Sequence, residues 1–234
     1  MKRLFLSLLI VLLLTGCGGK KTADLSPLEI LMKTSEKMKT LQGFQVAIET
    51  SGAPAYLDLE GTLAISGMEG HYVAPDNVQA TVRVIAPGLV VEVEVISIGE
   101  DIWQTNVFTG QWEEIPDNWG FNPSSLLEAN AGFPAMLATD ITELQLTKDV
   151  ELEEMPGKKL YLISGEMKGD KLYDLTALIG PDPIDAQIWI DPDTFEVQRA
   201  ILHESAGDPE NERTWQIDFW DFNNTIEIEA PDIG

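Results

Sequence analysis

Cys17 is the only cysteine in the 234 residues, and it lies where its sulfur can be modified. It follows Thr15 and Gly16, which come directly after an apolar run from Leu4 to Leu14. The stretch Leu14-Thr15-Gly16-Cys17 resembles the bacterial lipobox, in which the cysteine sulfur is diacylated and the chain is cut before it. An unpaired thiol on an exported protein would be a reactive liability, whereas an alkylated sulfur is an inert thioether. We therefore predict lipidation at Cys17.

The first 16 residues have the pattern of a secretory signal peptide. Lys2 and Arg3 form a basic head, and the apolar run after them is shorter than the roughly 20 residues of a membrane-spanning helix. We expect residues 1–16 to be removed and acyl chains on Cys17 to hold the mature chain on the outer, extracytoplasmic side of a bacterial cell membrane. The alternative is an ordinary signal peptide with a coincidental cysteine. Residues 17–26 are small and polar, which is typical of a flexible tether.

Other residues capable of chemistry do not form a recognisable site. His71 and His203 lie in separate segments without a cysteine partner, so we expect no metal site. The stretch Asp191-Pro192-Asp193-Thr194 lacks the glycine and closing glutamate of a calcium-binding EF-hand, and its residue types favour a hairpin turn. The sequence contains no Gly-x-Ser-x-Gly, no Ser-x-x-Lys and no phosphate-binding glycine loop. We therefore expect no catalytic residues, no cofactor and no enzymatic activity.

The charge of the chain excludes one class of partner. There are 39 aspartates and glutamates against 15 lysines and arginines, for a formal net charge of −24. Nucleic acids are bound through basic patches, so we expect no nucleic-acid partner. The acidic residues are interspersed with apolar ones, which is typical of the solvated surface of a packed domain.

Helical periodicity is confined to a few segments. Ser26-Pro27-Leu28-Glu29 has the residues of a capping box and predicts an amphipathic helix of about fifteen residues that ends before Gly43. The segment 122–139 predicts a second helical region, which Gly132 interrupts. The segment 170–179 fits either a short helix or a strand.

Most of the remaining chain alternates apolar and polar residues, which predicts antiparallel strands with one apolar face. A sheet of about ten such strands should twist and curl. We therefore predict an α+β fold, with a curved antiparallel sheet forming an unclosed half β-barrel and a few helices covering its concave face, as a single domain over residues 27–234. The expected strands are 44–48, 57–65, 78–84, 91–95, 102–106, a short one around Trp112, 144–152, 159–165, 186–191, 197–204, 214–222 and 226–228.

Few helices are available to cover this concave face, so the interior could accept an acyl chain. The same apolar side chains could equally fill the space as an ordinary core. Both interpretations remain open from the pattern alone. The candidate lining residues are Val82, Val84, Val91 and Val93 from the sheet and Leu127, Phe133, Met136 and Leu137 from the helical cover.

Four stretches resemble the LppX/LprG-type (LppX_LprAFG) bacterial lipoproteins, whose fold is similar to that of the LolA and LolB carriers. The resemblance implies a curved, unclosed barrel wrapped around helices, with a cavity for lipid acyl chains, and it brings no catalytic motif. It implies the binding of a lipid or glycolipid and its transport across the cell envelope. The stretches are Ile98–Pro116, Asn122–Ala138, Leu160–Gly165 and Gln187–Leu202.

The resulting expectation is a membrane-anchored lipoprotein that holds lipid acyl chains in an apolar cavity and carries the lipid within the cell envelope. Its expected partners are the lipid and the membrane to which Cys17 is attached, and an envelope transporter is a candidate partner. The alternative is a lipoprotein that binds no ligand and acts as a docking or accessory module for another envelope protein.

Overall fold

The computed structural model describes residues 24–58, 60–115, 122–205 and 212–233. The predicted signal peptide and Cys17 lie outside the described residues, as does most of the predicted tether. The helices and strands of the described residues lie between Pro27 and Trp220.

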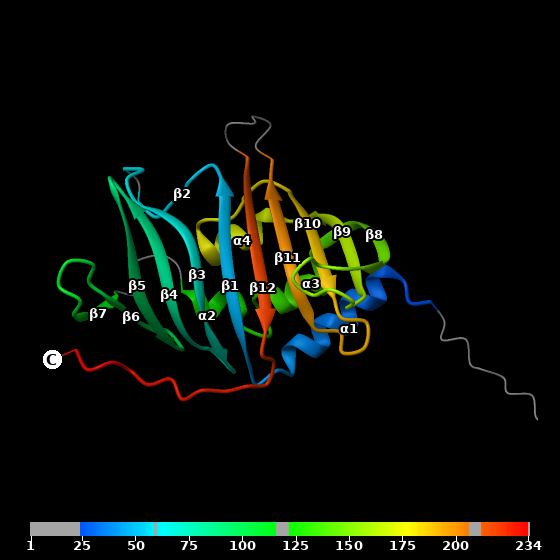
Figure 1. Ribbon diagram of the computed structural model, residues 1–234, viewed down its shortest axis with the longest axis horizontal. Helices are drawn as coiled ribbons and strands as arrows, with labels where there is room; N and C mark the ends of the chain where they lie inside the picture. The colour runs from blue at the N-terminus through cyan, green and yellow to red at the C-terminus, as the bar shows by residue number, and fades with distance from the viewer. Residues whose placement is uncertain (1–23, 59, 116–121, 206–211, 234) are drawn as a thin grey trace, which may run out of the picture.

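The strands form one curved antiparallel sheet that does not close (Figure 1). Its order is β7-β6-β5-β4-β3-β1-β12-β11-β10-β9-β8, and the short β2 pairs with β3. The predicted α+β fold is therefore confirmed, with twelve strands. The strands are β1 (Gly43–Gly52), β2 (Ala55–Tyr56), β3 (Ala64–Val73), β4 (Asn77–Ala86), β5 (Leu89–Ile98), β6 (Asp101–Thr105), β7 (Trp112–Ile115), β8 (Ile141–Val150), β9 (Leu160–Met167), β10 (Ile184–Ile190), β11 (Val197–Glu204) and β12 (Arg213–Trp220).

Four helices lie behind the sheet in the view of Figure 1. They are α1 (Pro27–Lys39), α2 (Pro123–Leu127), α3 (Phe133–Thr139) and α4 (Gly169–Thr176). The capping box that begins α1 is formed as predicted: the Ser26 N–H donates to the Glu29 carboxylate (2.8 Å), and the Glu29 N–H donates to Ser26 Oγ (3.3 Å). No helix among the described residues is long and apolar enough to cross a membrane.

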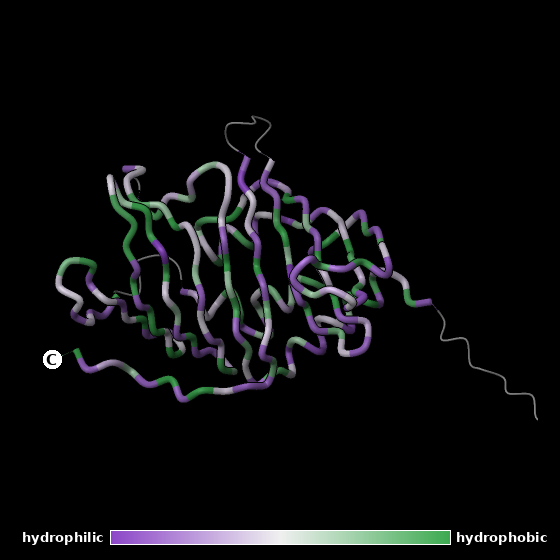
Figure 2. Tube along the Cα trace, viewed as in Figure 1, coloured by the Kyte–Doolittle hydropathy of each residue, from purple (hydrophilic) through white to green (hydrophobic). Residues whose placement is uncertain are grey.

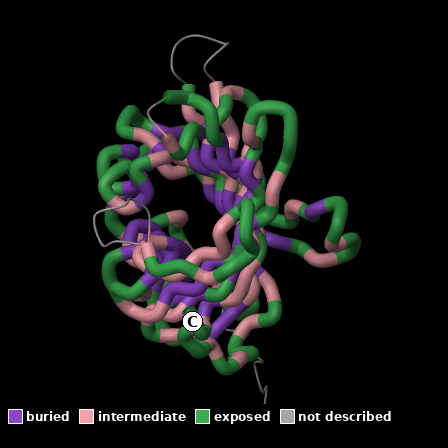
Figure 3. Tube along the Cα trace, turned by 90° about the vertical axis from the view of Figure 1, so that its left-hand side faces the viewer, coloured by how far each residue is buried: buried purple, intermediate pink, exposed green. Residues whose placement is uncertain are grey.

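The main core lies between these helices and the concave face of the sheet. Phe219 on β12 is at its centre, with its ring centroid 5.5 Å from that of Phe44 on β1 and 6.0 Å from that of Phe133 on α3. Ile30 and Leu31 of α1 are fully buried in the same cluster. Figure 3, seen from the β7 side, shows buried positions in the interior and exposed positions around the outside.

Two predicted strands are wrong. In the segment 57–65, Asp58 accepts hydrogen bonds from the N–H groups of Thr62 (3.0 Å) and Leu63 (2.7 Å), so the chain turns after β2 and β3 begins only at Ala64. The segment 226–228 belongs to no strand, because the chain leaves the sheet after β12. The segment 170–179, for which both structures were open, forms α4.

Candidate functional site

The four candidate valines lie together on the concave face of β4 and β5. Val82 pairs with Val93 across the two strands, and Val84 pairs with Val91. Val84 and Val93 are buried in a cluster of their own, while Val82 and Val91 are partly buried against it. Antiparallel pairing of two alternating segments brings all four side chains to one face.

The sheet extends this apolar surface beyond the residues that the sequence indicated. Val95 on β5 and Ile102 on β6 are buried in the same cluster, and Ile115 on β7 packs against it. Every member of this cluster belongs to a strand, and none comes from a described helix. We call this surface the valine wall, comprising Val82, Val84, Val91, Val93, Val95, Ile102 and Ile115. The sequence signal for its additional members is the same alternation, continued into the short strands at 101–105 and 112–115.

The four candidate residues of the helical cover have different surroundings. Leu127 of α2 and Phe133, Met136 and Leu137 of α3 are all buried in the main core. Val82 packs against both clusters and so lies at their border. The structure thus divides the eight candidate lining residues into two groups of four, one in the valine wall and one in the main core.

The cavity that the structure shows beneath α2 and α4 is small. An apolar cavity of about 20 Å³ lies between the sheet and the helices α2 and α4. One water molecule needs about 10–15 Å³, and small-molecule pockets measure about 300–1,000 Å³. The sequence did not indicate this cavity, because Thr176, Leu178 and Ile179 on its α4 side lie within the segment 170–179, whose structure was left open. It is lined by Ile48, Ile65, Met68, Leu126, Thr176, Leu178, Ile179 and Trp215.

A buried polar junction fastens α2 beside the valine wall. Ser97, at the end of β5, donates from its hydroxyl to Asn122 Oδ1 (2.7 Å), and the Asn122 amide donates to the carbonyl of Gly99 (2.9 Å). Asn122 Oδ1 also accepts from the N–H of Ser124, so Asn122 is the N-cap residue of α2. This junction places the start of α2 at the border between the wall and the core.

A second junction holds the other helices of the cover together. Asp140, directly after α3, is almost fully buried and accepts a hydrogen bond from the Lys171 ammonium of α4 at 2.7 Å. Thr139 donates its hydroxyl to the same carboxylate, and Lys168 lies 3.9 Å away. Burial alone would raise the pKa of Asp140, but the hydrogen bonds from Lys171 and Thr139 outweigh it and hold the pKa below its usual value. The ionised carboxylate therefore links α3 to α4.

The opposite face of β4 and β5 is polar. A groove of about 630 Å³ runs over β1, β3, β4 and β5 on this outer face and is bordered by Ile226 of the C-terminal segment. Its side chains include Thr81, Arg83, Glu92 and Glu94, which alternate with the valines of the wall. The same two strands thus present an apolar surface to the concave side and a charged surface to the outside.

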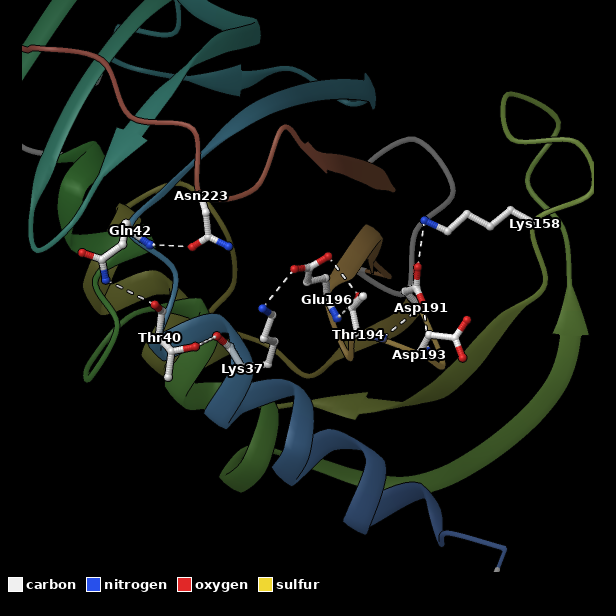
Figure 4. A network of polar contacts seen from close by, with 9 residues as sticks. All are labelled: Lys37, Thr40, Gln42, Lys158, Asp191, Asp193, Thr194, Glu196 and Asn223. Atoms are coloured by element: carbon white, nitrogen blue, oxygen red, sulfur yellow. Dashed lines mark hydrogen bonds and ion pairs between the residues drawn. The ribbon is translucent and has the colours of Figure 1, made fainter. Parts of the chain in front are cut away.

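The aspartate-rich stretch after β10 forms a hairpin turn. Asp191 Oδ1 accepts from the N–H groups of Asp193 (2.8 Å) and Thr194 (3.3 Å), and its other oxygen lies 2.9 Å from the Lys158 ammonium (Figure 4). Burial opposes ionisation here, but Lys158 and the two N–H groups lower the pKa of Asp191. Glu196 then forms an ion pair with Lys37 of α1 (3.2 Å). The turn interpretation is confirmed, and the turn secures the C-terminal end of α1.

The histidines remain separate in the structure. His71 lines the outer groove, and His203 Nδ1 lies 3.0 Å from the Thr214 hydroxyl. The described residues contain no group of three or more histidines, cysteines or carboxylates arranged to hold a metal ion.

Comparison with solved structures supports the fold. LprF from Mycobacterium bovis aligns with a TM-score of 0.65 at 15% identity, covering 88% of this chain and 96% of that one. The lipoprotein LppX from Mycobacterium tuberculosis aligns with a TM-score of 0.59 at 17% identity, covering 86% and 97%. No curated protein sequence matches the chain significantly.

The comparison with protein families is more specific than these structural matches. The model of the LppX_LprAFG lipoproteins matches residues 26–228, which include every helix and strand described above. The resemblance noted in the sequence is thereby confirmed over nearly the whole described domain. The chain belongs to the LppX_LprAFG lipoprotein family.

Proposed function

We propose that this protein is a membrane-anchored lipoprotein that binds the acyl chains of a lipid or glycolipid on its concave face and carries the lipid within the cell envelope. The observation that carries the proposal is the valine wall, an apolar concave surface whose packing cluster includes no residue of a described helix. Val84 and Val93 are already buried at 7% exposure each, so contact with an acyl chain would remove from water the area that the partly buried Val82, Val91 and Ile115 still expose, which contributes about 25 cal/mol per Å² of apolar area.

The helix-covered half supports the wall as a rigid frame. Its core is filled by aromatic and aliphatic side chains, and its cavity of about 20 Å³ is far smaller than an acyl chain needs. An acyl chain would therefore lie along the valine wall and reach the helices at the border residue Val82. The polar lipid headgroup would stay at the open side, where it keeps its hydration.

The anchor completes the proposed arrangement. Acylation of Cys17 would attach the chain to the extracytoplasmic side of the cell membrane, because two or more acyl chains give durable attachment where one is marginal. Mass spectrometry of the full-length chain, extracted from bacterial membranes, should find the mature protein beginning at an acylated Cys17. Cys17→Ala should abolish this modification. An unmodified cysteine in the mature chain would overturn the anchor without touching the lipid-binding proposal.

Lipid extraction tests the carrier function directly. A soluble form lacking residues 1–17 is purified under native conditions, and its organic extract is analysed by mass spectrometry. A stoichiometric lipid supports the proposal, as does saturable uptake of a fluorescent fatty acid by protein from which lipid has been removed. The absence of both would contradict it.

The filled core favours a second candidate function. A domain whose cavity beneath α2 and α4 measures only about 20 Å³ could act as a docking or accessory module for another envelope protein. In that case the soluble form would contain no lipid and take up no fatty acid, and it would instead copurify with a protein from the envelope in fixed stoichiometry.

A further inference from the structure

Exposed apolar side chains gather where three connections leave the sheet. The β2–β3 connection exposes Leu57 and Leu63, the β4–β5 hairpin exposes Leu89 and Val90, and the β6–β7 hairpin exposes Val107 and Phe108. Because neighbouring strands are antiparallel, these three alternate connections follow the same ends of their strands. In Figure 1, the β2–β3 connection and the β4–β5 hairpin lie at the upper left, and the β6–β7 turn lies below them at the left edge. We call these six residues the apolar rim.

The β6–β7 turn holds its apolar side chains outward. Asn106 Oδ1 accepts from the N–H groups of Phe108 (3.0 Å) and Thr109 (3.2 Å), and the Asn106 carbonyl accepts from the N–H of Gly110 (2.8 Å). The turn is therefore fixed by its own hydrogen bonds, while the Phe108 residue remains 93% exposed. A single exposed phenylalanine would be ordinary, but Phe108 belongs to a group of six exposed apolar side chains, and such a group indicates an interaction surface.

The rim is continuous with the valine wall. On the concave face, the pair Val84 and Val91 in the wall is followed by Ala86 and Leu89 at the tip of the hairpin, while the intervening pair Ile85 and Val90 lies on the opposite face of the same two strands. Figure 2 shows the hydrophobic colouring running along β4 and β5 towards this tip. An acyl chain on the wall would thus have an apolar path to the rim.

The charge of the rim favours a neutral partner. The three connections contain no lysine or arginine, and their charged residues are Asp58 and Glu60. The Asp58 carboxylate is already engaged by Thr62 and Leu63 within its own turn. Anionic lipids attract basic segments and would be repelled by a chain of net charge −24, so apolar insertion into a neutral lipid surface is the interaction that these side chains can make.

We infer that the apolar rim is a membrane-contact surface, which inserts Leu89, Val90 and Phe108 into the headgroup region of a neutral, zwitterionic bilayer and brings the valine wall to that bilayer. The inference rests on the proposed function, because contact at the rim would let a lipid pass between the bilayer and the wall. A protein partner fits less well: protein interfaces rely on tryptophan, tyrosine and arginine within packed pockets, whereas the rim presents aliphatic side chains and one phenylalanine on separate turns.

Site-specific labelling tests the contact. The soluble form lacking residues 1–17 contains no cysteine, so Val90→Cys and Phe108→Cys each provide one thiol for an environment-sensitive fluorophore. Val107→Cys is a third rim position, and its matched control is Leu28→Cys on α1, at the far side of the molecule, since Val107 is 47% exposed and Leu28 is 48% exposed. With phosphatidylcholine vesicles, the rim labels should brighten and shift to the blue, while the control label should not change.

Vesicle flotation with unlabelled protein provides the second measurement. Phe108→Ser should weaken partitioning onto phosphatidylcholine vesicles roughly tenfold, because burial of a phenylalanine side chain would be lost. Leu28→Ser should leave it unchanged. Replacing part of the phosphatidylcholine by phosphatidylglycerol should weaken binding of the wild type. Because Phe108 is exposed, its substitution should leave the thermal unfolding midpoint unchanged.

Three results would overturn the inference. They are rim labels that behave like the control label, binding that is stronger on phosphatidylglycerol vesicles, and rim substitutions that dissolve a dimer or a protein complex while vesicle binding stays the same. The outcome is separable from that of lipid extraction. If the domain contains lipid but does not bind vesicles, only the membrane-contact role of the rim is refuted. If the domain binds vesicles but neither contains lipid nor takes up fatty acid, only the carrier function is refuted.

Discussion

Strands β8 to β12 and strands β4 to β7 share the same alternation of apolar and polar residues, but their concave faces have different surroundings. On the first group, Phe219, Ile188 and Ile163 pack in the main core together with residues of α1 and α3. On the second group, Val84 and Val93 form a cluster whose members all come from strands. An identical periodicity therefore produces a closed core in one half and an apolar wall in the other.

The side chains of the two halves differ in kind as well as in cover. The main core contains the stacked rings of Phe44 and Tyr72, with centroids 4.9 Å apart, and those of Phe133 and Phe219. The buried members of the valine wall are three valines and one isoleucine. Large rings interlock with helices and stabilise one packing, whereas short β-branched side chains make a smooth surface on which a flexible chain can lie. We expect the first half to determine stability and the second to determine binding.

The largest expected difference is in the cost of removing a buried side chain. Phe133→Ala should lower the free energy of unfolding by about 3–5 kcal/mol, because the filled core cannot collapse around the space left by the ring. Val93→Ala should cost only about 1–2 kcal/mol, since two methyl groups are lost next to a surface that is free to adjust. Urea unfolding of both variants measures the difference. Equal losses would show that the wall is packed as tightly as the core.

The junction at Asp140 tests whether the cover acts as a unit. Asp140→Asn keeps the size of the side chain but removes the charge that meets Lys171 and Lys168, and we expect a loss of about 1–2 kcal/mol, because the half-exposed lysine side chains screen part of the interaction. The control is Asp170→Asn, an exposed carboxylate nearby, which should change stability by no more than about 0.5 kcal/mol. If both variants unfold at the same urea concentration as the wild type, the junction does not stabilise the cover.

Many of the strand positions could be read from the sequence, because each half of the sheet has a clear alternation, but the order of the strands in the sheet could not. The start of α1 was also predictable, since Ser26, Pro27 and Glu29 each have a defined role in a helix cap. The segment 57–65 misled the prediction because its leucines alternate as in a strand. Asp58 nevertheless closes a turn by accepting hydrogen bonds from Thr62 and Leu63, and residue spacing alone does not show that contact.

The division of the candidate site could not be predicted for a related reason. The sequence predicts that Val82 and Phe133 both face inward. Only the packing of α3 against α1 and the core shows that Phe133 belongs to the main core while Val82 lies at its border. That packing depends on contacts between distant residues, such as Asp140 with Lys171, which have no local signal. The rim was equally hidden, because an apolar pair such as Val107 and Phe108 becomes informative only when the structure shows it exposed on a turn.

A substitution at the border of the two halves should separate binding from stability. Val82→Asn places an amide on the valine wall, and affinity for a fluorescent fatty acid should fall roughly tenfold, because an acyl chain would bury that amide without a partner. The control, Thr81→Asn, lies on the outer face of the same strand and should bind like the wild type. If folded Val82→Asn binds the fatty acid with unchanged affinity, the acyl chain lies elsewhere. The two halves of the sheet would then differ in their contribution to stability and not in ligand binding.

The smallest expected effect is a pH dependence confined to the helix-covered half. The folded state holds the pKa of Asp140 below its ordinary value of 3.8, so its ionised form contributes stability that is fully present above that value and is lost as the pH falls through the lower, folded pKa. Asp140→Asn cannot lose a proton at this position, so the gap in unfolding free energy between it and the wild type should be constant near neutral pH and should shrink below about pH 4. Urea unfolding at several pH values measures this gap. The difference in unfolding free energy between Val93→Ala and the wild type should not narrow, because no carboxylate belongs to the cluster of Val93. If the difference narrows equally for both variants, acid weakens the whole sheet and does not act through the Asp140 junction.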